Sequence, residues 1–300
     1  MTVAAICILF TAFCILSTVY CLLPTICHFL ATVHHCTNMT YFGFLLRFLG
    51  IPILILGLVA YLDHRRGRRI PENFRGWPFW AAVLLHVVVA VVYTTPWDNY
   101  LVATGVWYYD TNLVTGIVLG YVPIEEYTFF VVQSILAGLW IAFLMRRMRF
   151  DGPPAPLNNR WRIAPVLLLG VLWVISVAVL ISGWQPGVYL SILLAWALPP
   201  IMLQFGFGGD ILRRYGRLVL FSIGGLTLYL SVADFLAIGS GTWEINPAQS
   251  LHWLILSVLP VEEVIFFFIT NTLLTLGIVL ILALESHERF AEMRARVRRR

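Results

Sequence analysis

Residues 123–130 read Pro-Ile-Glu-Glu-Tyr-Thr-Phe-Phe, and residues 260–267 read Pro-Val-Glu-Glu-Val-Ile-Phe-Phe. A second match lies upstream, because residues 98–107 and 234–243 share Asp at the first position, Gly at the eighth and Trp at the tenth. Similarity at a nearly constant offset indicates a repeated structural unit. The chain is therefore interpreted as two copies of one unit, each carrying a pair of adjacent glutamates.

The sequence around both motifs is too apolar for a soluble protein. Of the 300 residues, 60% are hydrophobic and 12% are charged, and the mean hydropathy is +0.86, whereas soluble domains carry about 25% charged residues. A helix needs about 20 apolar residues to cross a bilayer. Runs of that length cover residues 3–30, 41–62, 77–95, 113–145, 163–181, 187–206, 217–236 and 249–284.

Counting the runs gives the architecture. Each repeat uses three of them, and the run at 163–181 lies between the repeats. Equivalent helices are thus separated by an even number of crossings, so both repeats point the same way across the membrane. We predict an all-α polytopic membrane helix bundle, made of two same-orientation three-helix repeats joined by a connector helix. It has seven spans and a possible extra helix at the N-terminus.

The basic residues predict the orientation. All 20 are arginine, and the absence of lysine excludes a retinal protein with a Schiff base. Except for Arg47, they lie in the connections after the second, fourth and sixth runs and in the C-terminal tail. By the positive-inside rule these segments are cytoplasmic. We expect an integral protein of the cell membrane with a cytoplasmic C-terminus and no nucleic-acid partner.

Five segments follow from this pattern. They are an apolar extension (1–38), the first repeat (39–150), a connector with the linking helix (151–186), the second repeat (187–285) and a basic cytoplasmic tail (286–300). The extension contains every cysteine and no charged residue, and it lacks the basic start of a secretory signal. We expect it to precede a natural start at Met39, the alternative being an eighth spanning helix.

The glutamates are the main candidates for chemistry. In straight helices Glu125, Glu126, Glu262 and Glu263 would lie near the bilayer middle, whereas broken first turns at the preceding prolines would bring them closer to the outer face. We expect the broken turns, because the two runs are longer than a bilayer requires. Burial and a like-charged neighbour both favour a protonated carboxyl, which can donate a proton. One member of each pair is expected to face a cavity, because adjacent helical residues point about 100° apart.

Aromatic residues follow the acids directly. In a dry cavity their ring faces can stabilise a carbocation, although such residues more often fill a core or face lipid. Asp98 and Asp234 are ambiguous between cap, interface residue and catalytic aid, and His86 and His252 are expected to be packing or interface residues. The candidate substrate-binding or cation-stabilising residues are Asp98, Trp107, Tyr127, Phe129, Phe130, Asp234, Trp243, Phe266 and Phe267.

Several reaction classes lose support because their motifs are missing. The sequence has no strict dinucleotide fingerprint, phosphate loop, zinc spacing or aspartate-rich magnesium diphosphate motif. We therefore expect no metal and no cofactor. A proton-coupled transporter with mid-membrane glutamates is the main alternative, but it needs polar residues on both sides of the acids, and we expect the cytoplasmic side to stay apolar. A non-catalytic helical scaffold is the third interpretation.

The stretch Thr95-Pro96-Trp97-Asp98-Asn99-Tyr100-Leu101, the Gly105-Val106-Trp107 that follows and the two Pro-x-Glu-Glu motifs resemble the membrane-integral lycopene and carotenoid cyclase family. That family includes two-subunit bacterial enzymes, fused single-chain forms and the cyclase domain of fungal bifunctional enzymes. The chain resembles a fused form over about residues 39–285.

The resemblance implies an intramembrane lycopene beta-cyclase, an isomerase of carotenoid biosynthesis. It would convert the ψ-ends of lycopene to β-rings by acid catalysis, giving β-carotene via γ-carotene, with Glu125, Glu126, Glu262 and Glu263 at the centre. Its partners would be the linear carotene and membrane lipid. Which glutamate is acid and which is base, the ring type, the number of ends cyclised, the carotene length, the oligomeric state and any association with other carotenoid enzymes stay open.

Overall fold

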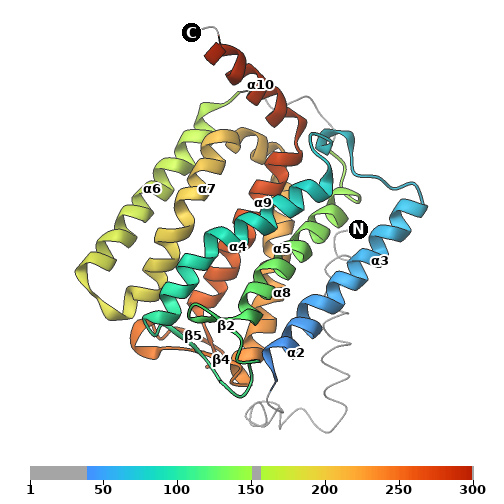
Figure 1. Ribbon diagram of the computed structural model, residues 1–300. Helices are drawn as coiled ribbons and strands as arrows, with labels where there is room; N and C mark the ends of the chain where they lie inside the picture. Colours follow the sequence, from blue (N-terminus) through green and yellow to red (C-terminus); the bar gives the residue numbers. More distant parts are fainter. Residues whose placement is uncertain (1–38, 151–156, 299–300) are drawn as a thin grey trace.

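Seven long apolar helices dominate the computed structural model, which describes residues 39–150 and 157–298 (Figure 1). The predicted extension 1–38 lies outside the described residues. Each of the seven is long and apolar enough to cross a bilayer, which confirms the predicted polytopic all-α bundle. The protein is an integral membrane protein. The first helix of the first repeat runs from α2 (Tyr41–Leu45) through a π-helical turn (Leu46–Gly50) to α3 (Ile51–Arg65). The other two helices of this repeat are α4 (Phe79–Ala103) and α5 (Ile124–Met145), and the connector α6 (Asn159–Ser182) follows. The second repeat consists of α7 (Val188–Arg214), α8 (Gly216–Gly239) and α9 (Val261–Leu282).

Three short antiparallel strand pairs lie together at one end of the bundle (Figure 1). They are β1 (Trp107–Tyr109) with β4 (Trp243–Ile245), β2 (Val118–Leu119) with β3 (Val122–Pro123), and β5 (Leu254–Ile255) with β6 (Leu259–Pro260). The runs at 113–145 and 249–284 are therefore not continuous helices. In each of them a loop and hairpin precede the helix.

Proline sets where these two helices begin. Pro123 and Pro260 have extended backbone, with ψ of 151° and 139°, and α5 and α9 start at the next residue. Proline lacks the N–H that the preceding turn would need, so it ends the hairpin rather than kinking a helix. Both glutamate pairs consequently lie in a first helical turn at the strand end. This confirms the expected broken turns, and neither glutamate pair lies in the middle of a continuous helix.

The two repeats meet as related halves. In the β1–β4 pair, Tyr108 lies opposite its repeat counterpart Glu244, so a local two-fold axis passes between them. Deeper in the bundle the Gln133 side chain on α5 donates to the Thr270 hydroxyl on α9 at 3.2 Å, again joining positions that correspond in the two repeats. The connector α6 packs beside α7 at the periphery, and Ser176 is its buried residue.

The expectation of an apolar interior beyond the acids is wrong. Gln133, Asn271 and Thr275 are all buried between the helices. The Gln133 amide donates to the Asn271 side-chain oxygen at 3.5 Å, and such bonds between helices occur inside membrane proteins. His86 is buried as well, and its Nδ1 lies 2.8 Å from the Ala82 carbonyl oxygen, which agrees with a packing role. The expected lack of polar residues on the cytoplasmic side of the acids therefore cannot be used as an argument against a transporter.

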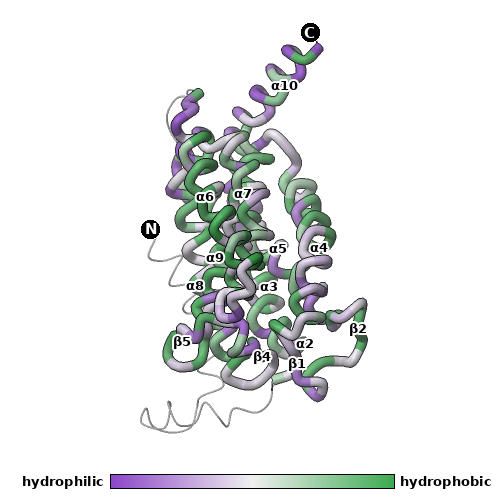
Figure 2. Tube along the Cα trace, turned by 90° about the vertical axis from the view of Figure 1, so that its left-hand side faces the viewer, coloured by the Kyte–Doolittle hydropathy of each residue, from purple (hydrophilic) through white to green (hydrophobic). Residues whose placement is uncertain are grey.

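Arginine–carboxylate pairs hold the opposite end of the bundle, where hydrophilic residues gather (Figure 2). Arg147, just after α5, binds Asp63 at the end of α3 with N–O distances of 2.8 and 3.2 Å. Arg289 binds Asp210 near the end of α7 at 2.8 and 2.7 Å. Arg289 belongs to α10 (Leu284–Arg298), so the predicted basic tail contains a helix. Each pair ties the first helix of a repeat to the segment that follows its third helix.

Candidate active site

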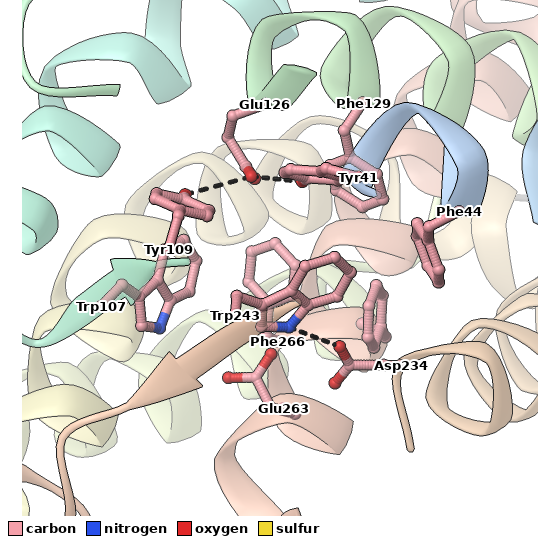
Figure 3. A pocket seen from close by; sticks show the side chains of 11 residues that line it. Tyr41, Phe44, Trp107, Tyr109, Glu126, Phe129, Asp234, Trp243, Glu263 and Phe266 are labelled. Atoms are coloured by element: carbon pink, nitrogen blue, oxygen red, sulfur yellow. Dashed lines mark hydrogen bonds between the residues drawn. The ribbon is translucent and has the colours of Figure 1, made fainter. Parts of the chain in front are cut away.

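Glu126 and Glu263, one from each repeat, face a shared pocket at the strand end of the bundle (Figure 3). The empty space around the lining side chains, including the open side of the pocket, is about 410 Å³. Both glutamates are at most 5% exposed. The lining residues come from both halves: Tyr41, Phe44, Trp107, Tyr109, Glu126, Phe129, Asp234, Trp243, Glu263, Phe266 and Phe267.

Two phenols hold the Glu126 carboxyl. The Tyr41 hydroxyl at the start of α2 donates to Glu126 Oε2, and the Tyr109 hydroxyl on β1 donates to the same oxygen at 3.2 Å. Burial, and then the nearby Glu126 carboxyl, hold the pKa of the Tyr109 phenol well above its ordinary value. The phenol therefore remains a hydrogen-bond donor at neutral pH.

Glu263 has a different set of neighbours. The Tyr189 hydroxyl at the start of α7 donates to Glu263 Oε1 at 2.5 Å. Asp234 on α8 lines the same pocket beside Glu263, and its Oδ1 accepts a hydrogen bond from the Trp243 indole at 3.0 Å. Two carboxyls and a phenol thus meet in a place with little access to water. Such a cluster can hold and exchange protons.

The first glutamate of each pair binds a backbone N–H group outside the pocket lining. Glu125 accepts a hydrogen bond from the Thr115 backbone N–H at 2.6 Å, and Glu262 accepts one from the Leu251 N–H at 2.6 Å. Neither residue lines the pocket. Both contacts join the start of a spanning helix to the segment that leads into its hairpin. The predicted division of each pair between the cavity and a supporting contact therefore matches this geometry.

The two repeats differ at their aspartates. Asp98 is fully buried outside the pocket lining, and neither of its carboxylate oxygens has a hydrogen-bond partner among the described residues. Its repeat counterpart Asp234 lies in the pocket and binds Trp243, whereas the indole N–H of Trp107 has no partner in the described part of the chain. The pocket is consequently not symmetric.

Most of the predicted aromatic residues meet in the pocket. Phe266 lies 5.8 Å from Trp107 and 5.2 Å from Phe267, and Phe129 lies 6.4 Å from Phe267 across the repeat boundary, all measured between ring centroids. Trp243 stacks obliquely on Tyr41 at 4.8 Å. These rings form an apolar wall next to the carboxyls.

Two predicted aromatics lie elsewhere. Phe130 is buried but does not line the pocket. The Tyr127 hydroxyl donates to the Leu119 carbonyl at 2.8 Å and accepts from the Asn99 amide at 3.0 Å, so Tyr127 holds the β2–β3 hairpin.

Among the described residues, no group of three or more His, Cys, Asp or Glu side chains is arranged to hold a metal ion.

Comparison with known proteins identifies the family. The chain is 37% identical over 244 residues to lycopene beta-cyclase of Halobacterium salinarum, and the match covers 80% of this chain and 95% of that protein. The chain belongs to the lycopene beta-cyclase family. Membership in this family leaves the transporter alternative without support.

Fungal members of the cyclase family match as well. The chain is 33% identical over 202 residues to the bifunctional lycopene cyclase/phytoene synthase of Sporisorium reilianum, and the match covers 65% of this chain and 29% of that protein. For the bifunctional protein of Podospora anserina the identity is 34% over 199 residues, covering 64% of this chain and 33% of that protein. No family model and no solved structure match the sequence.

Sequence reasoning missed the phenols of this pocket. Tyr41, Tyr109 and Tyr189 bind the two glutamates, and Phe44 lines the pocket. A signal was present, because Tyr41 and Tyr189 both open the first helix of a repeat. The motif comparison began only at the second helix of each repeat and did not reach them.

Proposed function

We propose that this protein cyclises the ψ-ends of lycopene to β-rings, forming β-carotene via γ-carotene. The observation that carries the proposal is the pocket in which Glu126 and Glu263, contributed by different repeats, meet beside an aromatic wall. The relatives named lycopene beta-cyclase support the same reaction.

The reaction is an isomerisation in which protons balance. A carboxylic acid protonates the terminal double bond of the ψ-end and leaves a tertiary carbocation. The neighbouring double bond attacks this cation, which closes the six-membered ring and moves the charge to a ring carbon. A carboxylate then removes a ring proton and forms the new double bond. One proton enters and one leaves, so substrate and product are isomers and the reaction needs no net oxidant or reductant.

The hydrogen bonds suggest separate roles for the two glutamates. Glu126 accepts from two phenols, and donors to a carboxylate stabilise its charged form, which suits the base. Glu263 lies beside Asp234, and two close carboxyls favour keeping a shared proton, which suits the acid. Transfer of a proton from Glu126 back to Glu263 restores both groups for the next cycle.

The aromatic wall would stabilise the cation between these two proton transfers. A cation over an aromatic face gains about 0.5–2 kcal/mol, most when water is excluded. Phe129, Phe266 and Phe267 are buried, so they also keep water from adding to the cation. Glu125 and Glu262 would then act by positioning the starts of α5 and α9 around the site.

We also propose how the protein lies in its membrane. The arginine-rich end, including the C-terminus, faces the cytoplasm of the cell, and the pocket lies towards the opposite face. A lipid-soluble carotene reaches the pocket from the bilayer, and membrane lipid surrounds the exposed helix faces.

The test is expression in a bacterium that accumulates lycopene, with the carotenes separated by chromatography. The wild-type chain is expected to produce γ-carotene and β-carotene. Glu126→Gln and Glu263→Gln should abolish conversion while the protein still inserts. Glu244→Gln is the matched control, because Glu244 is exposed outside the pocket. Unchanged lycopene with well-expressed wild type would refute the function, and normal products from either pocket variant would refute the assigned site.

A further inference from the structure

The C-terminal helix α10 has an exposed apolar stripe. Phe290, Met293 and Val297 are 60%, 41% and 75% exposed, and their spacing of three and four residues puts them on one helix face. The helix lies beyond the end of the spanning bundle (Figures 1 and 2). The stripe is separate from the pocket and has no role in the proposed chemistry.

The charges of α10 are sorted around this stripe. At about 100° per residue, Arg289 and Arg296 on one side and Arg294 on the other lie roughly 70–90° from the centre of the stripe. Glu288 and Glu292 lie roughly 130–170° from it, on the far face. An apolar stripe flanked by arginines, with acids directed away, is the pattern of a helix that lies in a membrane interface.

The contacts between α10 and the bundle place the stripe on the side of α10 that would face the membrane. Ser286 is buried against the bundle and precedes Phe290 by one helical turn, so the stripe continues the face of α10 that contacts the protein. Ala283 breaks the helix with extended backbone directly after α9, and the Arg289–Asp210 pair fixes the first turns of α10 to α7. Helix α10 therefore starts where a membrane span ends, at the depth of the lipid headgroups.

The rest of α10 lacks protein support. Every residue from Phe290 to Arg298 is exposed, and helices of this length are marginal in water without a surface to pack on. Arginine guanidinium groups pair with phosphates through two parallel hydrogen bonds. We propose that α10 is a membrane-surface helix that binds anionic phospholipid, with Phe290, Met293 and Val297 inserted at the acyl boundary and Arg294 and Arg296 on headgroup phosphates.

Hydrogen–deuterium exchange of the full chain in lipid nanodiscs tests this surface. Amides of residues 290–298 are expected to exchange at least tenfold more slowly in nanodiscs with phosphatidylglycerol than in nanodiscs of phosphatidylcholine alone. Phe290→Ser combined with Val297→Ser should remove this protection. Ala291→Ser combined with Ala295→Ser should retain it, because these substitutions lie on the polar side of the same helix.

Three results would overturn the proposal. They are equal exchange in the two lipids, protection that survives loss of the stripe, and protection in detergent that rises with protein concentration. The last result would assign the stripe to a second copy of the chain. Cyclisation is not the readout, so failure of the proposed enzymatic function leaves this test unaffected.

Discussion

Removing the Tyr41 hydroxyl tests whether the phenols serve the Glu126 carboxyl. Tyr41→Phe deletes a donor to Glu126 but keeps the ring that packs on Trp243 at 4.8 Å. A hydrogen bond to a charged group contributes about 1.5–3 kcal/mol, and about 1.4 kcal/mol corresponds to tenfold in rate. Because Tyr109 still donates at 3.2 Å, we expect the lower end of this range, about a tenfold loss of kcat.

The assay is the initial rate of γ-carotene formation by purified protein in lipid, over a range of lycopene concentrations. KM should stay within about twofold, because the aromatic contacts of Tyr41 are retained. Removing both donors, with Tyr41→Phe and Tyr109→Phe together, should lower kcat about 100-fold. Tyr93→Phe is the control, since its hydroxyl donates to the Trp196 carbonyl on the exposed side of the bundle. An unchanged kcat in the double variant would refute the role of the phenols.

Four further outcomes are expected. Asp234→Asn should slow turnover more than Asp98→Asn, because only Asp234 lies in the pocket; equal initial rates would contradict this. Phe266→Leu should lower kcat by up to about 30-fold through loss of a cation–π contact, and an increase in KM alone would assign Phe266 to binding. Since burial raises the pKa of Tyr109 well above its ordinary value, its phenol stays protonated as pH rises from 7 to 9, and the rate ratio of wild type to Tyr109→Phe should be constant over this interval. Asp210→Asn should destabilise the fold by about 3 kcal/mol, because Arg289 loses a buried partner, with a lower melting temperature in detergent as the measure.

Several features of this protein could be predicted from local patterns in its sequence. Apolar runs are recognisable because a bilayer imposes one length on every spanning helix. The motif pairs around Glu125–Glu126 and Glu262–Glu263 revealed the repeat and led to the carboxyls, since acids are costly in an apolar run.

Only the tertiary structure decided which acids meet and what holds them. Glu126 and Glu263 are 137 residues apart, and their shared pocket depends on how β1 pairs with β4 and how α5 packs on α9. Tyr41 and Tyr189 reach their glutamates across 85 and 74 residues, so no local pattern connects them. The asymmetry between Asp98 and Asp234 has the same cause: the two repeats carry the same residue at this position, and differences in packing around each one determine whether it lines the pocket.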